Sequence, residues 1–457
     1  MTKKFFAPCA LLPEGWAQNV LIDIDNAGNI ARIRCDSTAD DAKYLNGTLL
    51  PGIPNVHSHA HQRAITGLTE HTGQSRDSFW TWRDKMYRFA EKLTPEHFRS
   101  IAAMLYLEMM KAGYTTVGEF HYLHHQPGGQ PYDNVAEMSL QLIQAANLSG
   151  IRLTLLPVLY QYSGFFKNKP SDEQKLFVCT DEMFINIFQS LADCIPQYPG
   201  LNIGIAPHSL RAVSEESLSA VLSETRRKLP GPVHIHIAEQ GKEIEDCLRR
   251  FGRRPVQRLF DQFDVDDDWC LIHATHCIDE EIDKMAASGC VVGLCPTTEA
   301  NLGDGVFRAT DYLAQNGRIG IGSDSQISID PVQEMRWLEY SQRLAQHRRN
   351  VLAGGYDQST GMGLLNRIYQ GGARALSRKI GQIAVGYRAD FITLDETAPT
   401  LLHRRQNRLV DSWIFASNSI LVNDVIVGGE HRVIDGRHPN EEIITKAFDS
   451  SIGELTR

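Results

Sequence analysis

Short apolar segments alternate along the chain with longer amphipathic ones, and this alternation dominates its pattern of hydrophobic and polar positions. The apolar segments are nearly continuous, which is typical of parallel strands buried on both faces. The amphipathic segments predict helices that cover such a sheet; one begins at Thr94 with Pro95 and another stops at Gly150. Eight strands are predicted, at residues 48–56, 116–122, 152–160, 202–207, 233–238, 270–274, 290–294 and 318–323.

Eight strands with intervening helices indicate the α/β class and, within it, a (β/α)8 barrel of the TIM type. A doubly wound open sheet is the alternative, but the glycine-rich phosphate loop that normally follows the first strand of that fold is missing. Both ends of the chain instead show short strands with turn residues. We expect a small β-sandwich domain formed from both termini, with residues 1–48 and 381–457 as its two parts and residues 49–380 as the barrel.

The composition narrows the classes of partner. The chain has 457 residues, 42% of them hydrophobic, which is enough for a large core and excludes a disordered protein. Its formal net charge is −9 and it has no basic run, so nucleic acid and membrane surfaces are not expected partners. No apolar run approaches the roughly 18 residues that cross a bilayer. Nine irregularly spaced cysteines without a C-x-x-C pair predict free thiols and a cytoplasmic protein.

Histidines stand at the ends of several predicted strands. His57 and His59 end the first, and because alternate strand residues point to the same face, both side chains should enter the mouth of the barrel. The fifth strand carries His234 and His236. Either only one of them points to the metal, or both face inward and one binds the metal while the other supports it. Glu239 follows three residues after His236, where a carboxylate suits proton transfer better than metal binding.

Two further side chains complete the pattern. His273 ends the sixth strand and Asp324 ends the eighth, although an aspartate there could instead cap a helix. Three imidazoles and one carboxylate converging at one end of a barrel can hold one divalent ion and leave room for a water molecule. Such a set accepts zinc, iron or manganese, and we expect zinc.

This arrangement resembles the amidohydrolase superfamily over nearly the whole chain. Members with two metals usually bridge them with a carboxylated lysine on a middle strand, and residues 152–160 and 202–209 contain no lysine, which indicates the one-metal branch that includes deaminases. Within that branch, four longer strings resemble the formimidoylglutamate deiminase family of histidine degradation. They are HSHAHQRA at 57–64, FWTWRDKMY at 79–87, EFHYLHH at 119–125 and APHSLR at 206–211.

The resemblance implies a homodimer that uses one divalent ion per chain to hydrolyse N-formimino-L-glutamate to N-formyl-L-glutamate and ammonia. Because this substrate has two carboxylates, guanidinium groups that bind carboxylates through paired hydrogen bonds are expected around it, on loops above the barrel. The implied metal ligands are His57, His59, His236 and Asp324; the implied catalytic residues are Glu239, His273 and Asp324; the implied substrate contacts are Gln62, Arg83, Tyr122, His208 and Arg211.

Three alternatives stay open at this point. A deaminase of guanine or a related base, or a hydrolase of substituted triazines, would use the same metal site. Such an enzyme is expected to have stacking aromatic residues where this chain has paired arginines. A barrel that has lost catalysis and serves in assembly is less compatible with five intact residues of the metal and proton-transfer set. Six other histidines are expected to form structural hydrogen bonds only: His61, His121, His124, His125, His234 and His276.

Overall fold

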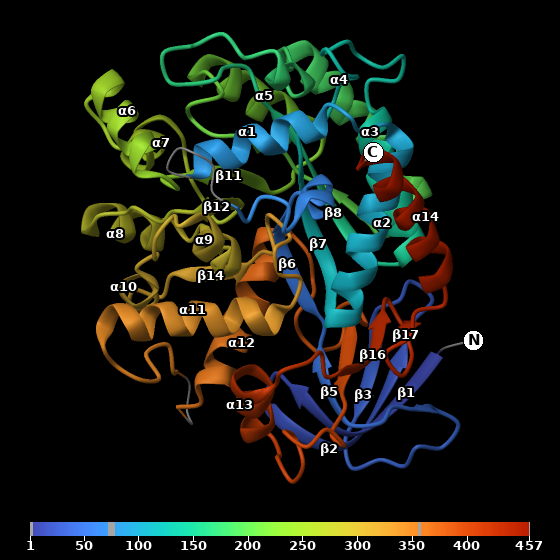
Figure 1. Ribbon diagram of the computed structural model, residues 1–457. Helices are drawn as coiled ribbons and strands as arrows, with labels where there is room; N and C mark the ends of the chain where they lie inside the picture. The colour runs from blue at the N-terminus through green and yellow to red at the C-terminus, as the bar shows by residue number, and fades with distance from the viewer. Residues whose placement is uncertain (1–2, 72–77, 355–357, 457) are drawn as a thin grey trace.

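Parallel strands form the barrel that the sequence predicts (Figure 1). The computed structural model describes residues 3–71, 78–354 and 358–456. All eight predicted barrel strands are present within it. They are β6 (Ile53–Ser58), β7 (Tyr114–His121), β8 (Arg152–Leu159), β9 (Leu201–Ile203) with its continuation β10 (Ala206–Pro207), β11 (Val233–Ile237), β12 (Trp269–His273), β13 (Val291–Leu294) and β14 (Arg318–Ile321).

Two half-barrels meet at two short joints. Strands β6 to β10 form one parallel sheet and β11 to β14 form the other. A parallel bridge between Ile205 and Val233 closes one joint, and a bridge between Ser58 and Asp324 closes the other. At the second joint the Asp324 amide donates to the carbonyl of His57 at 3.0 Å, and the His59 amide donates to the carbonyl of Asp324 at 3.1 Å. The residues predicted to bind metal therefore also close the barrel.

Helices surround the barrel and begin and end where the sequence indicates. Thr94 accepts a hydrogen bond from the amide of His97 at 3.2 Å and starts α2, and Gly150 ends α3 in the left-handed conformation, with φ of 86°. No described helix combines the length and hydrophobicity of a membrane span. The helices are α1 (Phe79–Ala90), α2 (Pro95–Ala112), α3 (Glu137–Ser149), α4 (Asp181–Ala192), α5 (Glu215–Lys228), α6 (Gly241–Phe251), α7 (Pro255–Gln262), α8 (Asp279–Ser288), α9 (Pro296–Leu302), α10 (Ala309–Ala314), α11 (Pro331–Gln346), α12 (Thr360–Ala375), α13 (Asn407–Ala416) and α14 (Glu441–Leu455).

The two ends of the chain meet in one mixed sheet beneath the barrel (Figure 1). Its strand order is β17-β16-β15-β5-β1-β2-β3, with β4 beside β1, and it has a hydrophobic core of its own around Val20, Ile22 and Phe391. The last helix, α14, lies instead against α2 of the barrel. The strands are β1 (Lys3–Leu12), β2 (Gly15–Ile24), β3 (Ile30–Arg34), β4 (Lys43–Tyr44), β5 (Thr48–Pro51), β15 (Phe391–Leu394), β16 (Val422–Val427) and β17 (Glu430–Val433).

The prediction of one strand over residues 48–56 is wrong, because Gly52 divides it. The chain leaves the mixed sheet after β5 and enters the barrel as β6. At the crossing, a Cβ atom on Gly52 would lie 2.3 Å from the side chain of Thr115, so only glycine fits there. The Gly52 amide donates to the carbonyl of Asp390 at 2.9 Å, which fixes the first barrel strand to the mixed sheet.

Candidate metal centre and active site

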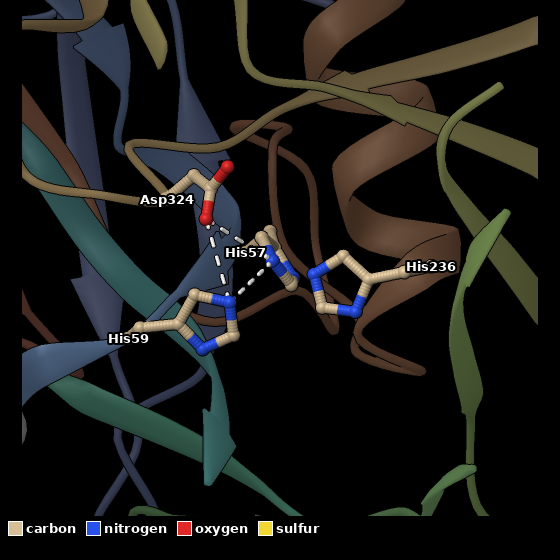
Figure 2. A group of neighbouring side chains, drawn as sticks. All are labelled: His57, His59, His236 and Asp324. Atoms are coloured by element: carbon tan, nitrogen blue, oxygen red, sulfur yellow. Dashed lines mark hydrogen bonds and ion pairs between the residues drawn. The ribbon is translucent and has the colours of Figure 1, made fainter. Parts of the chain in front are cut away.

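Four side chains converge at the mouth of the barrel (Figure 2). His57 and His59 come from the end of β6, His236 from β11, and Asp324 from the segment after β14. One potential ligand atom of each lies within 4.8 Å of the others, and all four residues are buried. The Nε2 atoms of His57 and His59 are 3.2 Å apart, and Asp324 Oδ1 lies 3.5 and 3.4 Å from them.

The hydrogen bonds around these imidazoles orient nitrogen lone pairs toward the centre. His59 Nδ1 lies 2.9 Å from the carbonyl oxygen of Phe120, which can only accept, so Nδ1 carries the proton and Nε2 does not. His236 Nδ1 is held in the same way by the carbonyl of His208, at 3.3 Å. Burial lowers the pKa of His57 to about 3 and also lowers the pKa of His59 and His236, so the rings are neutral. Neutral imidazoles and a carboxylate fit a divalent cation.

Backbone geometry at the strand ends aims the acidic and histidine side chains inward. Ala238 after β11, His273 at the end of β12 and Asp324 after β14 have φ values of 53°, 69° and 47°. Non-glycine residues seldom adopt this left-handed conformation, and it concentrates at functional sites. The reversal turns each chain sharply as it leaves the barrel, so Asp324 faces the centre and is not the N-cap of a helix.

Glu239 and His273 lie beside the candidate metal centre. His273 Nε2 is 3.9 Å from Glu239 Oε1 and 3.7 Å from Asp324 Oδ2, and its Nδ1 is 3.2 Å from Glu299 Oε1. Although burial alone would lower it, the neighbouring carboxylates, Glu239 first among them, raise the pKa of His273 to about 10. Burial raises the pKa of Glu239 above its ordinary value. His273 can therefore hold a proton near neutral pH, and burial favours the protonated form of Glu239.

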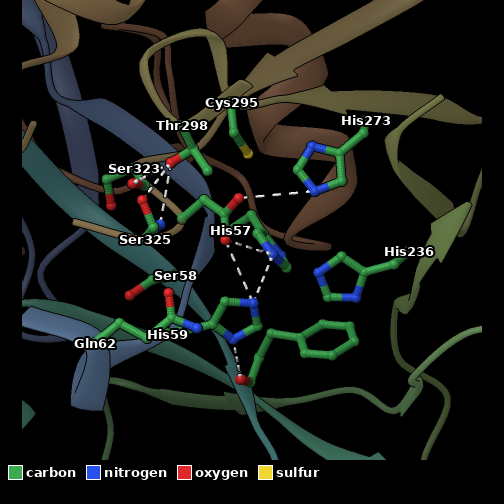
Figure 3. A network of polar contacts seen from close by, with 12 residues as sticks. His57, Ser58, His59, Gln62, His236, His273, Cys295, Thr298, Ser323 and Ser325 are labelled. Atoms are coloured by element: carbon green, nitrogen blue, oxygen red, sulfur yellow. Dashed lines mark hydrogen bonds and ion pairs between the residues drawn. The ribbon is translucent and has the colours of Figure 1, made fainter. Parts of the chain in front are cut away.

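Cys295 lies close to this group in Figure 3 and forms a second cluster with His273 and Asp324. Burial raises the pKa of its thiol well above the ordinary value, which disfavours the thiolate form. All nine cysteines are free thiols, as predicted.

A cavity opens above these residues. Its wall combines aromatic side chains with charged groups, and His57 lies beneath it, fully buried. Every residue predicted to contact substrate or to transfer protons faces this cavity: Gln62, Arg83, Tyr122, His208, Arg211, Glu239, His273 and Asp324.

Arg83 reaches the cavity from a helix, so its predicted loop position is wrong. It lies on α1 with Phe79, Met86 and Ala90, at a spacing that places all four on one helix face. The three apolar residues are buried, and this face covers the barrel mouth. The Arg83 guanidinium lies 4.7 Å from the ring centre of Trp80, a cation–π contact that holds it in place.

Arg211 lies in the turn region after β10, as predicted for a loop residue. Its Nη1 atom is 3.6 Å from Glu243 Oε2, and the two side chains are 12% and 1% exposed. That Nη1 is buried without a hydrogen-bond partner. The guanidinium is therefore anchored on one side and has hydrogen-bonding capacity left for a ligand.

The remaining predicted contacts are neutral. Gln62 Nε2 donates to the hydroxyl of Tyr122 at 3.0 Å, while the amide oxygen of Gln62 is buried without a partner. His208 Nδ1 lies 3.1 Å from the hydroxyl of Ser209, and burial lowers the pKa of His208 well below its ordinary value. These groups can orient a polar substrate without adding charge.

Three buried carboxylates in this region were not predicted. Glu299 holds His273, and Glu243 pairs with Arg211 and accepts from the amide of Glu239 at 3.2 Å. Glu119 accepts from the hydroxyl of Ser58 at 2.7 Å, and burial raises the pKa of Glu119 to about 7. Only Glu119 had a signal in the sequence, since it begins the string at residues 119–125. The others lie in helices whose polar positions look ordinary.

Three of the six unassigned histidines form hydrogen bonds to backbone carbonyls. His124, His125 and His234 contact the carbonyls of Val158, Val178 and Ala375 at 2.9, 2.7 and 2.7 Å. His234 thus points inward below His236 and is bonded to the end of α12.

The fold and the site define the class of this protein. Residues 48–432 match the model of the Amidohydrolase family, so the chain belongs to that family. Residues 2–45 match the model of the formimidoylglutamate deiminase HutF N-terminal domain. Both matches confirm the resemblance found in the sequence.

Three individual proteins show how similar this chain is to known relatives. Formimidoylglutamate deiminase of Pseudomonas aeruginosa is 49% identical over 450 residues, which cover 98% of this chain and 99% of that one. A crystal structure of an amidohydrolase from Brucella melitensis superimposes with a TM-score of 0.94 and 43% identity over 100% of both chains. An adenosine deaminase from Xanthomonas campestris with bound zinc shares the fold alone, with a TM-score of 0.82, 20% identity and coverage of 99% and 98%.

Proposed function

We propose that this protein hydrolyses N-formimino-L-glutamate to N-formyl-L-glutamate and ammonia, a reaction of histidine degradation. The observation that carries the proposal is the pair of guanidinium groups, Arg83 and Arg211, in the cavity above the candidate metal centre. Two planar cationic groups suit a substrate with two carboxylates. The near-full-length likeness to the deiminase of Pseudomonas aeruginosa supports the same activity.

His57, His59, His236 and Asp324 would hold one divalent ion, for which we propose zinc. Three imidazole nitrogens and one carboxylate are a donor set that zinc favours. When bound, the ion lowers the pKa of a coordinated water molecule toward neutrality and so supplies a nucleophile at neutral pH.

The side chains of the protein account for the proton transfers. As the oxygen of water bonds to the formimino carbon, Asp324 and His273 orient the water, and Asp324 accepts one of its protons, since His273 is already protonated. Glu239, whose pKa burial raises, delivers a proton to the imine nitrogen. Glu239 then takes the proton of the new C–OH group and passes it to the same nitrogen, the carbon–nitrogen bond breaks, and ammonia leaves. The oxygen stays as the formyl carbonyl, and the proton held by Asp324 restores Glu239. Arg83 and Arg211 bind the carboxylates and thereby position the formimino carbon.

Ammonia release from N-formimino-L-glutamate, guanine and cytosine tests this proposal directly. We expect turnover with the first only. Release from guanine would instead favour a base deaminase, and retained metal with no turnover on any substrate would favour the assembly role. The cavity has aromatic residues, among them Trp82 and Tyr87, but a flat base would leave both arginines without a carboxylate.

We also propose that the enzyme works as a homodimer in the cytoplasm. The resemblance to the deiminase family supports the dimer, and nine free thiols are typical of a reducing compartment. Light scattering on the eluting peak of a sizing column measures the mass, and a monomer of 51.3 kDa would contradict the dimer.

A further inference from the structure

A second cavity lies at the opposite end of the barrel from the candidate metal centre. It is enclosed by the mixed sheet, the end of α3 and the starts of β8 and β9, whereas the metal ligands lie at the carboxyl ends of the strands. Three arginines line it. Arg152 is the first residue of β8, Arg388 precedes β15, and Arg432 belongs to β17.

These arginines form no direct ion pair with the acidic side chains that the structure describes. Among the residues that the structure describes, no carboxylate oxygen lies within ion-pair distance of Arg152, Arg388 or Arg432. The Nε atoms of all three are buried without a hydrogen-bond partner. Arg152 donates to the carbonyl of Pro199 at 3.1 Å, and Arg388 donates to Asn29 Oδ1 at 3.1 Å and to the Ala27 carbonyl. Much of their hydrogen-bonding capacity is therefore left over.

The guanidinium groups also crowd one another. A Cβ atom on Gly428 would lie 2.1 Å from Arg152 Nη2 and 2.3 Å from Arg388 Nη2, so these two nitrogens are within a few ångströms of each other. Gly150 approaches Arg432 in the same way, with 2.8 Å from its Cβ position to Nε. Like charges held together inside a protein repel strongly, since little water screens them.

The charge around the cavity is not balanced from within the protein. Asp390 is buried nearby, and its Oδ1 accepts from the amide of Gly428 at 2.6 Å. A fourth guanidinium, Arg378, lies behind it, and burial, together with the charge of Arg152, lowers the pKa of Arg378 to about 9. Glu430, at the rim, is already paired with Lys3. The single carboxylate of Asp390 thus faces Arg152, Arg378 and Arg388. Arg432 adds a further positive charge near Arg152.

We propose that this cavity binds a small anion that carries phosphate or carboxylate groups and at least two negative charges. Guanidinium groups bind both kinds of oxyanion through paired hydrogen bonds. Because Arg152 belongs to the barrel while Arg388 and Arg432 belong to the segments of the mixed sheet, the bound anion would tie the two together. The site is separate from the active site, and its existence does not depend on the proposed reaction.

Calorimetric titration of the metal-loaded, full-length enzyme tests the proposal with two probes, inorganic phosphate and succinate, each compared with chloride at equal ionic strength. We expect saturable binding of at least one probe and none of chloride. Arg432→Gln, which removes a side chain without any described hydrogen bond, should weaken that binding by roughly 10- to 150-fold, the range for a charged hydrogen bond. The matched control is Arg437→Gln, which removes an exposed arginine in the turn after β17 and should bind as wild type does.

The outcomes distinguish a phosphate ligand from a carboxylate ligand, and binding in this cavity from binding in the active site. Binding of phosphate alone indicates a phosphorylated ligand, and binding of succinate alone indicates a carboxylate. Arg83→Ala should leave the affinity unchanged, since it alters only the active-site cavity. The proposal is overturned if neither probe binds wild type, if chloride competes equally, or if Arg83→Ala and not Arg432→Gln abolishes binding. Arg388→Gln serves in the same comparison if the Arg432 variant does not fold.

Discussion

Replacing Arg211 with alanine should weaken both substrate use and stability, whereas replacing Arg83 should weaken substrate use alone. Each arginine would donate a charged hydrogen bond to a substrate carboxylate, worth about 1.5–3 kcal/mol, so kcat/KM should fall roughly 10- to 150-fold in either variant. The effects on stability differ because the partners differ. Glu243, beside Arg211, is 1% exposed, while Asp84, 3.5 Å from Arg83, is 57% exposed.

The structure sets the size of that difference. Removing one member of a buried ion pair destabilises a protein by about 3–5 kcal/mol, because the other charge stays buried without a partner. We expect about 3 kcal/mol for Arg211→Ala, the lower end of that range. Burial already raises the pKa of Glu243, so this carboxyl can take up a proton instead. For Arg83→Ala the expected loss is about 0–1 kcal/mol, as for other surface pairs.

Ammonia release against substrate concentration gives kcat/KM, and urea denaturation gives the free energy of unfolding. The double variant Arg211→Ala/Glu243→Gln separates the two roles, because it removes the stranded charge but not the need for a cation. Its free energy of unfolding should return toward that of wild type, while its kcat/KM should stay as low as that of Arg211→Ala. Recovery of kcat/KM in the double variant, or an Arg211→Ala protein as stable as wild type, would refute this reasoning.

Three further predictions concern the metal, the proton transfer and the mixed sheet. Elemental analysis should find about one divalent ion per chain and little in His236→Ala; two firmly bound ions would contradict a single site. Glu239→Gln should keep the metal while turnover falls by roughly 10²-fold, so near-normal turnover would exclude its proposed role. Although burial opposes it, the hydrogen bond from His431 lowers the pKa of Asp424, which adds stability that is complete above the ordinary value of 3.8 and is lost as the pH falls below it. In metal-free protein, Asp424→Asn should be less stable at pH 7 by about 1.5–3 kcal/mol, and denaturation at pH 3 should show a smaller difference.

The barrel could be predicted from the sequence because its signals are local. Each buried parallel strand is a short apolar run, and the ends of α2 and α3 carry their own capping residues. The first strand, β1, has a weaker signal in the sequence, since Pro8 and Cys9 interrupt its apolar run. The division at Gly52 was missed, because it depends on contact with Thr115, which lies far along the chain.

The candidate site, too, could be predicted from the sequence only in part. His57 and His59 could be placed together, because the two-residue repeat of a strand puts both on one face. The choice between His234 and His236 could not be made from that repeat, since both point inward and only depth in the barrel separates them. The roles of the predicted residues stay predictions, although the structure gathers all of them around one cavity. Glu243 could not be recognised from the sequence, because its partner Arg211 belongs to a different segment.

The mixed sheet has a consequence for synthesis of the chain on the ribosome. Strand β5 pairs on one side with β1, which the ribosome has already synthesised. On the other side it pairs with β15, where Leu50 lies opposite Ile392. At about 5–20 residues per second, roughly 340 residues of translation separate these two strands by tens of seconds. During that time the hydrophobic edge of β5 has no strand beside it. The nascent protein therefore exposes an aggregation-prone edge until its last part emerges, and we expect its yield to depend on chaperones that hold the N-terminal strands.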